Sequence, residues 1–120
     1  MPGPALILFA HGARDARWTA PFERVLERVA RAAPERSPML AYLEFIAPNL
    51  PSAIAQQVAR GHRSIRIVPL FLGQGGHVRA DVPRLIEAAR AAHPGVAIEL
   101  ARSAGEDDGV VDALAAFALR

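Results

Sequence analysis

Four short runs of apolar residues, separated by longer amphipathic stretches, organise the chain. The runs span residues 5–10, 39–45, 65–70 and 96–100. Short apolar runs bounded by turn residues are typical of strands that are buried on both faces of a parallel sheet. We therefore predict four strands. The second is the least regular, because helix-forming residues are mixed into its sequence, Met-Leu-Ala-Tyr-Leu-Glu-Phe.

Apolar residues at helical spacing follow the first and second runs. A helix after the first run is expected to end before Pro34, and its apolar face consists of Trp18, Phe22, Val25, Leu26 and Val29. Pro51 favours the first turn of the next helix, and Gly61 favours its end. The apolar face of that helix consists of Leu50, Ile54 and Val58. We expect Trp18 and Phe22 to lie in the core or at an interface.

The same spacing follows the third and fourth runs. After a loop over residues 73–77, Pro83 is expected in the first turn of a helix. The inward residues of this helix are Val82, Leu85, Ile86 and Ala89. Asp107 and Asp108 favour a further helix N-terminus. The apolar residues that follow are Val110, Val111, Leu114, Phe117 and Ala118.

Strands alternating with helices predict an α/β fold with three layers, α/β/α, around a four-stranded parallel sheet. The 120 residues are the length of a single domain, and we expect one domain over residues 1–120. In open parallel sheets, ligands bind beyond the carboxyl ends of the strands. Functional residues are therefore expected where the apolar runs end.

Composition excludes several classes of protein. The chain has no cysteine, which rules out a disulfide scaffold, thiolate metal ligands and a cysteine nucleophile. Its net charge is only +2 and no block of like charges occurs, so nucleic acid is not an expected partner. The first apolar run is too short to cross a membrane and lacks the basic start of a signal peptide. We expect a cytoplasmic protein without a membrane partner.

Three side chains able to bind metals or protons fall at the carboxyl ends of successive predicted strands. His11 follows the first strand, Glu44 lies at the end of the second, and His77 follows the third through a glycine-rich loop. Two imidazoles and one carboxylate suit a divalent cation such as Fe²⁺, Co²⁺, Ni²⁺ or Zn²⁺. The same groups suit proton transfer. The residues alone leave a metal site and an acid–base pair open.

The glycine-rich loop before His77 lets the backbone approach a ligand, and Gly75 and Gly76 are candidate substrate contacts. A dinucleotide fingerprint would need glycine at the position of Val78, and a phosphate-binding loop would need a lysine, which the chain lacks. No serine lies in a Gly-x-Ser-x-Gly elbow. Nucleotide binding and serine hydrolysis are therefore not expected.

Arginines flank both histidines. Arg14, Arg17 and Arg79 as a set are candidates to hold the carboxylates of an anionic substrate. A solvated surface position is the simpler interpretation of any one of them. The stretch Pro69–Leu72 is too apolar for an exposed loop, and we expect it to line a pocket for a flat apolar ligand.

Three blocks of the sequence carry a resemblance to a known family. They are His11-Gly12-Ala13-Arg14-Asp15, Leu43-Glu44 with Pro48 downstream, and Pro69-Leu70-Phe71-Leu72-Gly73-x-Gly75-Gly76-His77 with Asp81 and Pro83. Over nearly its whole length the chain resembles the short form of the CbiX/SirB-type class II chelatases. The resemblance implies a chelatase-like fold that forms one half of a bilobal chelatase. Ala13 stands where the family usually has serine, which removes one hydroxyl from the first loop.

The resemblance also implies an activity and a site. That family inserts Co²⁺, Fe²⁺ or, in some members, Ni²⁺ into sirohydrochlorin, in cobalamin or siroheme synthesis, with no cofactor beyond the substrate metal. His11 and His77 match its metal-binding histidines, and Glu44 matches its active-site glutamate. The expected partners are sirohydrochlorin or a related tetrapyrrole, the divalent metal, and a second copy of the chain in a homodimer that completes the cleft.

Two other functions remain as alternatives. A metal- or tetrapyrrole-binding carrier on the same scaffold would bind without turnover, and Glu44→Gln would hardly affect it. In an enzyme, the same substitution would lower the rate and leave affinity unchanged. A small α/β interaction module with incidental histidines would bind no metal near neutral pH.

Overall fold

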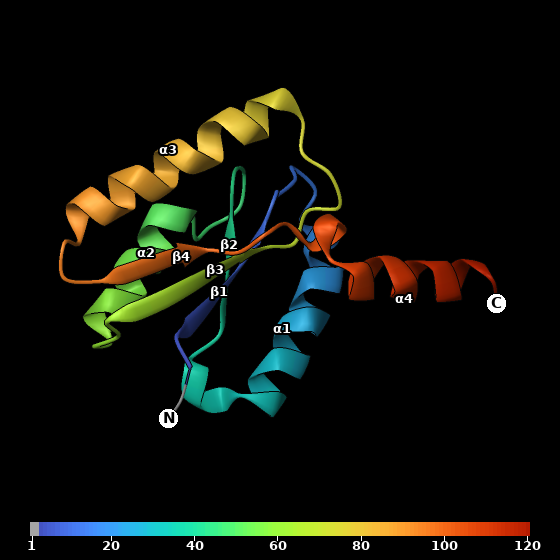
Figure 1. Ribbon diagram of the computed structural model, residues 1–120, viewed down its shortest axis with the longest axis horizontal. Helices are drawn as coiled ribbons and strands as arrows, with labels where there is room; N and C mark the ends of the chain where they lie inside the picture. Colours follow the sequence, from blue (N-terminus) through green and yellow to red (C-terminus); the bar gives the residue numbers. More distant parts are fainter. Residues whose placement is uncertain (1–2) are drawn as a thin grey trace.

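The computed structural model describes residues 3–120, apart from the side chain of His77. Its centre is a parallel sheet with the strand order β2-β1-β3-β4 (Figure 1). The strands are β1 (Ala5–Ala10), β2 (Met39–Tyr42), β3 (Ser64–Pro69) and β4 (Ala97–Leu100). Ile7 of β1 lies opposite Met39 of β2 and Ile67 of β3. The predicted α/β fold with a four-stranded parallel sheet is confirmed.

Two helices cover one face of the sheet, and their apolar side chains form the main core. They are α2 (Leu50–Ala59) and α3 (Gly76–Ala92), which lie on the same side of the sheet (Figure 1). Ile54 of α2 and Ile86 of α3 are at most 2% exposed and belong to one buried cluster with Ile67. Full burial of such a side chain contributes about 1.5–3 kcal/mol. β1 is apolar at every position, whereas β3 is apolar at its buried positions and carries Ser64 and Arg66 where it is less buried.

A single helix, α1 (Ala20–Ala32), covers the opposite face over β1 and β2 (Figure 1). Val29 of α1 packs in a second cluster with Leu8 and Tyr42. Val68 of β3 lies on the same face but is only half-buried. The three predicted layers are therefore present, and the half of this face over β3 and β4 is more open than the half under α1.

The last helix, α4 (Asp108–Ala118), begins where the two aspartates predict it. The carboxylate of Asp107 accepts a hydrogen bond from the Val110 N–H at 3.2 Å, which caps the helix. Instead of packing on the sheet, α4 projects from the body, and its main neighbour is the short 3₁₀ helix η3 (Ala104–Glu106) (Figure 1). No residue of α4 is buried.

The second strand is shorter than expected: it ends at Tyr42 and does not continue to Phe45. Phe45 has φ +69°, and the Ile46 N–H donates to the Glu44 carbonyl at 2.9 Å, which makes a tight γ-turn. The Tyr42 N–H donates to the Pro48 carbonyl at 2.9 Å, so the chain returns at once to the strand end. Glu44 therefore lies in a loop just beyond β2.

The third helix begins earlier than predicted. It starts at Gly76, so the preceding loop ends at Gly75, and Pro83 lies in the helix interior and not in the first turn. The inward residues are nevertheless the expected ones, because Val82 and Ile86 are at most 3% exposed. Pro83 wrongly suggested the first turn of the helix. Its ring is exposed on the outer side of the helix, and the packing of the inward residues outweighs the poor helix propensity of proline.

No helix in the described part of the chain combines the length and the apolar composition that crossing a membrane requires. The cytoplasmic location expected from the sequence stays a prediction.

Candidate active site

The loop after β1 and the loop after β2 meet beyond the carboxyl edge of the sheet. The Leu43 N–H donates to the Ala10 carbonyl at 2.9 Å, and the Glu44 N–H donates to the His11 carbonyl at 3.1 Å. Gly12 has φ +92°, and a Cβ atom there would overlap the Glu44 carbonyl oxygen. Only glycine allows both this left-handed backbone and this close approach.

This meeting of loops brings two of the predicted site residues into contact. His11 Nε2 lies 3.1 Å from Glu44 Oε1, and the two side chains are 49% and 39% exposed. A contact between two side chains this exposed contributes about 0–1 kcal/mol to stability, so the fold does not depend on it. When the Nε2–H of His11 donates to the carboxylate, Nδ1 keeps its lone pair and is available as a metal ligand or proton acceptor.

A buried aromatic ring supports the imidazole of His11. Phe71, just beyond β3, is 5% exposed and lies edge-on to the His11 ring, with the ring centroids 6.1 Å apart. Phe71 in turn packs on Phe9, with centroids 5.4 Å apart. The sequence placed Phe71 in an apolar run near the site, but its distance from His11 depends on how β1 and β3 pair.

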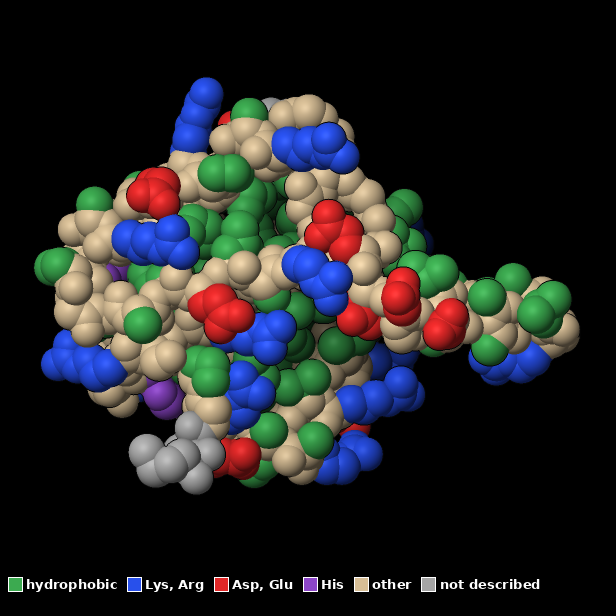
Figure 2. Space-filling view, in the orientation of Figure 1, with side chains coloured by type: hydrophobic (Ala, Val, Ile, Leu, Met, Phe, Trp, Pro, Cys, Tyr) green, Lys and Arg blue, Asp and Glu red, His purple; other side chains and the backbone are tan. Residues whose placement is uncertain are grey.

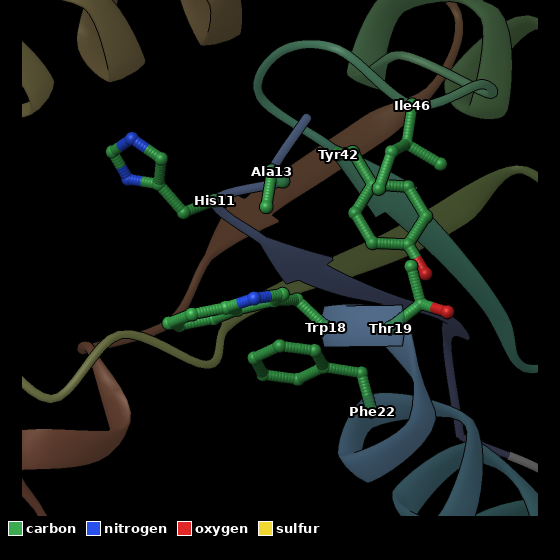
Figure 3. Close-up of a pocket in the computed structure, with 8 residues that line it drawn as sticks. His11, Ala13, Trp18, Thr19, Phe22, Tyr42 and Ile46 are labelled. Atoms are coloured by element: carbon green, nitrogen blue, oxygen red, sulfur yellow. The ribbon is translucent and has the colours of Figure 1, made fainter. Parts of the chain in front are cut away.

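An apolar pocket of about 390 Å³ opens beside His11. Its lining residues are His11, Gly12, Ala13, Trp18, Thr19, Phe22, Tyr42 and Ile46. Figure 3 shows the indole of Trp18 and the ring of Phe22 on one side, with Tyr42 and Ile46 on another. Trp18 is 69% exposed, so it is not a core residue of the described chain, and its other predicted place, at an interface, stays a prediction.

The stretch Pro69–Leu72 does not line this pocket, contrary to expectation. Pro69 and Phe71 are buried, and Phe71 belongs to the main core, whereas Leu72 is 65% exposed. Leu70 and Leu72 line two other pockets. The stretch therefore contributes to pockets but does not form one continuous wall, because residues at a strand end alternate between the two faces of the sheet.

Burial at the pocket affects Tyr42. Removal of its hydroxyl from water raises the pKa of Tyr42 above the ordinary value of 10.0, and the negative charge of Glu23 raises it further. Tyr42 therefore stays neutral at physiological pH and contributes its ring and an uncharged hydroxyl to the pocket wall.

The three candidate arginines lie in different surroundings. The guanidinium of Arg14 lies over the ring of Phe45, 4.5 Å from its centroid. Arg17 makes an ion pair with Asp15 at 2.6 Å, which lowers the pKa of Asp15 and raises the pKa of Arg17. Arg14 is thus held close to the loop that carries Glu44, whereas Arg17 already has an exposed carboxylate partner.

Arg79 lies at a second pocket, of about 300 Å³, between the loop after β3 and the segment after β4. Its lining residues are Leu72, Gly73, Gln74, Arg79, Ser103, Gly105 and Glu106. The Gln74 side-chain amide donates to the hydroxyl of Ser103, which is only 6% exposed. Gly75 caps the N-terminus of α3 and Gly76 is its first residue, so both lie at the same edge of the sheet. Sequence reasoning did not identify Gln74 and Ser103 as neighbours, because 29 residues separate them.

A family comparison bears directly on this edge of the sheet. The model of the CbiX family matches residues 5–118. This chain belongs to the CbiX family. The match includes the two loops that carry His11 and Glu44 and the start of α3.

Two curated relatives of this CbiX chain are sirohydrochlorin cobaltochelatases. It is 33% identical over 87 residues to a sirohydrochlorin cobaltochelatase of Methanocaldococcus jannaschii, and 32% identical over 87 residues to one of Methanococcus aeolicus. Each match covers 68% of this chain and 57% of the relative. The matched part thus spans little more than half the length of these relatives.

Solved structures share the fold of this CbiX chain. A CbiX protein of Marinobacter aquaeolei has a TM-score of 0.85 at 34% identity, with 97% of this chain and 94% of that chain covered. The sirohydrochlorin chelatase SirB of Bacillus subtilis subspecies spizizenii, in complex with cobalt, has a TM-score of 0.80 at 26% identity. That match covers 97% of this chain but only 49% of SirB.

His77 is the second residue of α3, and its side chain lies outside the described part of the structure. Among the described side chains, no group of three or more His, Asp or Glu residues forms a metal site. His11 and Glu44 supply two adjacent donors. The predicted role of His77 as a metal ligand stays a prediction for this CbiX chain.

Proposed function

We propose that this CbiX chain inserts a divalent metal, Co²⁺ or Fe²⁺ and in some settings Ni²⁺, into sirohydrochlorin, in cobalamin or siroheme synthesis. The observation that carries the proposal is the His11–Glu44 contact of 3.1 Å at the mouth of an apolar pocket. The curated relatives named sirohydrochlorin cobaltochelatase support this choice of substrate. SirB in complex with cobalt supports the metal.

Metal insertion needs a metal donor and a proton acceptor close together. A divalent ion that enters the macrocycle replaces two pyrrole N–H protons, which must leave the site. In our proposal, His11 and His77 hold the metal through neutral imidazole nitrogens. Glu44, in contact with His11 and open to solvent, accepts the pyrrole protons one after the other and passes each to water. A histidine that has handed over its metal is the alternative acceptor. The reaction needs no cofactor beyond the substrate metal.

The macrocycle would lie against the apolar pocket, with its carboxylates towards arginine. Trp18 and Phe22 offer flat apolar surfaces to it. Arg14 lies near the Glu44 loop and Arg79 at the second pocket, which supports a role for both in bidentate contacts with carboxylates. Arg17 is a further candidate to bind a substrate carboxylate, which would replace the carboxylate of Asp15 as its partner. The backbone of Gly75 and Gly76 provides the closest approach on the α3 side.

A second copy would complete the cleft. A pocket of about 390 Å³ is near the lower limit for drug-sized ligands, so it can hold only an edge of a tetrapyrrole. SirB, with twice the chain length, matches this chain over 49% of its own length. We therefore propose a homodimer in which two chains face one macrocycle.

The test mixes sirohydrochlorin anaerobically with Co²⁺ or Fe²⁺ and follows the absorbance change. The proteins compared are wild type, His11→Ala, His77→Ala and Glu44→Gln, with Glu87→Gln as an exposed control on α3. We expect wild type and the control to accelerate insertion and both histidine variants to lose the acceleration. Glu44→Gln should bind sirohydrochlorin and react about 10²–10⁴-fold more slowly.

Two outcomes would contradict the proposal. A wild-type rate equal to the uncatalysed rate, with sirohydrochlorin still bound, would indicate a carrier. No acceleration and no binding of metal or sirohydrochlorin would indicate an interaction module with incidental histidines.

A further inference from the structure

The walls of the pocket beside His11 are apolar. Trp18 and Phe22 form one wall of this space of about 390 Å³, and Tyr42 and Ile46 form another (Figure 3). No Arg, Asp or Glu is among the described residues that line it. Such a pocket accepts apolar groups, whereas a carboxylate inside it would lose its hydration without gaining an arginine partner.

The two hydroxyl groups of the pocket wall do not make it suitable for an anion. The Thr19 hydroxyl lies 2.8 Å from the Ala16 carbonyl oxygen and 3.1 Å from Glu23 Oε1, so its single proton is already used within the chain. Tyr42 is 4% exposed, and its pKa is raised by burial and by the negative charge of Glu23. The charge that acts on this wall is therefore negative, and it would repel a second carboxylate.

The candidate arginines lie around the apolar pocket and do not line it. Arg14 lies over the ring of Phe45, and Arg17 is paired with Asp15 at 2.6 Å. Arg79 lines the other pocket, next to the loop after β3. A ligand that carries both carboxylates and alkyl groups would therefore place its carboxylates outside the apolar pocket and its alkyl groups inside it.

Several arginines elsewhere on the body already have carboxylate partners. Arg66 lies 3.7 Å from Glu99, and Arg90 lies 2.9 Å from Glu87. Figure 2 shows basic and acidic side chains next to one another over one face of the body. Mixed charge of this kind does not form a cationic surface for a ligand with many carboxylates. The arginines near His11 thus remain the better partners for such a ligand.

The size of the apolar pocket sets how much of a tetrapyrrole it can take. A space of about 390 Å³ has room for one ring of the macrocycle with its small substituents, and not for all four rings. The peripheral groups of sirohydrochlorin are acetate and propionate chains and methyl groups. Only the methyl groups are apolar, so the ring that suits this pocket is one that carries a methyl group and directs its carboxylate chains outward.

We propose that the apolar pocket beside His11 is a subsite for a methyl-bearing ring of the tetrapyrrole, and that it sets the orientation of the macrocycle over His11. The inference rests on the proposed function for the class of ligand, and it adds which edge of that ligand the pocket selects. One small alkyl group in a fitted apolar pocket is worth about 10–200-fold in specificity. An edge that carries only carboxylate chains is excluded by the missing cation and by Glu23.

A pair of metal-free porphyrins tests the subsite. Coproporphyrin III and uroporphyrin III share one aromatic macrocycle, and the first has methyl groups where the second has acetates. Each is titrated with the full chain, and binding is followed by the Soret absorbance of the porphyrin. We expect coproporphyrin to bind at least about tenfold more tightly than uroporphyrin. Equal affinities, tighter binding of uroporphyrin, or binding of neither porphyrin would overturn the subsite.

A charge placed in the pocket wall tests where the preference arises. Trp18 lines the pocket and is 69% exposed, so its replacement leaves the core intact. Trp18→Lys adds a cation that attracts acetates, and it should lower the preference for coproporphyrin about fivefold. Trp18→Met removes the indole without adding charge and should keep the preference. Ala91→Lys, at an exposed position on α3, adds the same charge elsewhere and should also keep it.

The comparison of variants gives a second way to contradict the subsite. If Trp18→Lys and Trp18→Met show the same preference, the porphyrin substituents do not lie in this pocket. The titrations contain no metal, so they are separate from metal insertion. A chain that prefers coproporphyrin but does not accelerate insertion refutes only the chelatase, and an active chelatase without the preference refutes only the subsite.

Discussion

Single atoms decide the geometry of the candidate site. The backbone carbonyl oxygen of Glu44 occupies the space next to Gly12 that a side chain at position 12 would need. The carboxylate of Glu44 lies 3.1 Å from the His11 imidazole. Glycine at position 12 thus allows two loops, 33 residues apart, to lie in contact. The position of His11 and Glu44 at strand ends was predictable, whereas their contact depends on the γ-turn at Phe45.

Gly12→Ala should therefore disrupt both fold and site. The added methyl group combines a left-handed backbone with overlap against the Glu44 carbonyl, and we expect a loss of roughly 3 kcal/mol or more in the free energy of unfolding. Urea denaturation measures it. Gly73→Ala is the matched control, since its Cβ atom would meet nothing within 4 Å and should change stability by about 0.5 kcal/mol or less. Equal stabilities of the two variants would contradict the role of Gly12.

Tyr42 is the only tyrosine of the chain, so its ionisation can be followed without ambiguity. Because burial and Glu23 raise the pKa of Tyr42 above 10.0, tyrosinate absorbance should appear at higher pH in the folded protein than in the chain unfolded in guanidinium. The raised pKa stabilises the fold fully below pH 10.0, and this contribution is lost as the pH rises through the folded-state pKa. Identical titration curves for the folded and unfolded protein would contradict the burial of the hydroxyl.

In helix α3, the spacing of apolar residues determines which face is buried, whereas tertiary packing determines where the helix begins. The spacing of Val82 and Ile86 predicted the inward face of α3, and both are buried. The start of the same helix was misplaced, because Pro83 and the glycines before it signal a loop in the sequence. The chain remains helical through Pro83 because Val82 and Ile86, on either side of it in the sequence, pack in the main core. Packing of an apolar face thus outweighed local propensity.

Pro83→Ala should stabilise the protein. Proline in a helix interior cannot donate to the carbonyl four residues earlier, here that of Arg79, and residue 83 is exposed. We expect the free energy of unfolding to rise by about 1–3 kcal/mol in urea denaturation. Arg84→Ala, the next exposed position, should change it by about 0.5 kcal/mol or less. A loss of stability in Pro83→Ala would show that the fold requires the proline.

At the scale of the whole molecule, the described chain has one thinly covered face and one uncovered helix. α2 and α3 bury one face of the sheet, whereas α1 alone lies on the other and α4 extends along the 47 Å long axis (Figure 1). The pocket beside His11, about 390 Å³, is too small to enclose a whole tetrapyrrole. In the proposed homodimer, a second copy would cover α4 and enclose the macrocycle.

The thermal midpoint of unfolding should therefore depend on protein concentration. Association with a second folded chain stabilises the native state by mass action, so the midpoint should rise as the protein concentration is raised. Calorimetry or circular dichroism over a hundredfold range of concentration measures the rise. Leu114→Asp should abolish the dependence, and Ala91→Asp should retain it. A constant midpoint for wild type would contradict a dimer in which folding and association are linked.

The sequence by itself determined the fold class, the four strands and the residues that gather at the carboxyl edge of the sheet. These depend on local patterns: apolar runs that must be buried, helical spacing, and the rule that parallel strands end at one edge. Only the tertiary structure decided that β2 stops at Tyr42, that Glu44 contacts His11, and that α4 leaves its own sheet uncovered. Those features arise from contacts between segments far apart in the chain, such as Gly12 with Glu44 and Gly105 with Phe71, which no local pattern encodes.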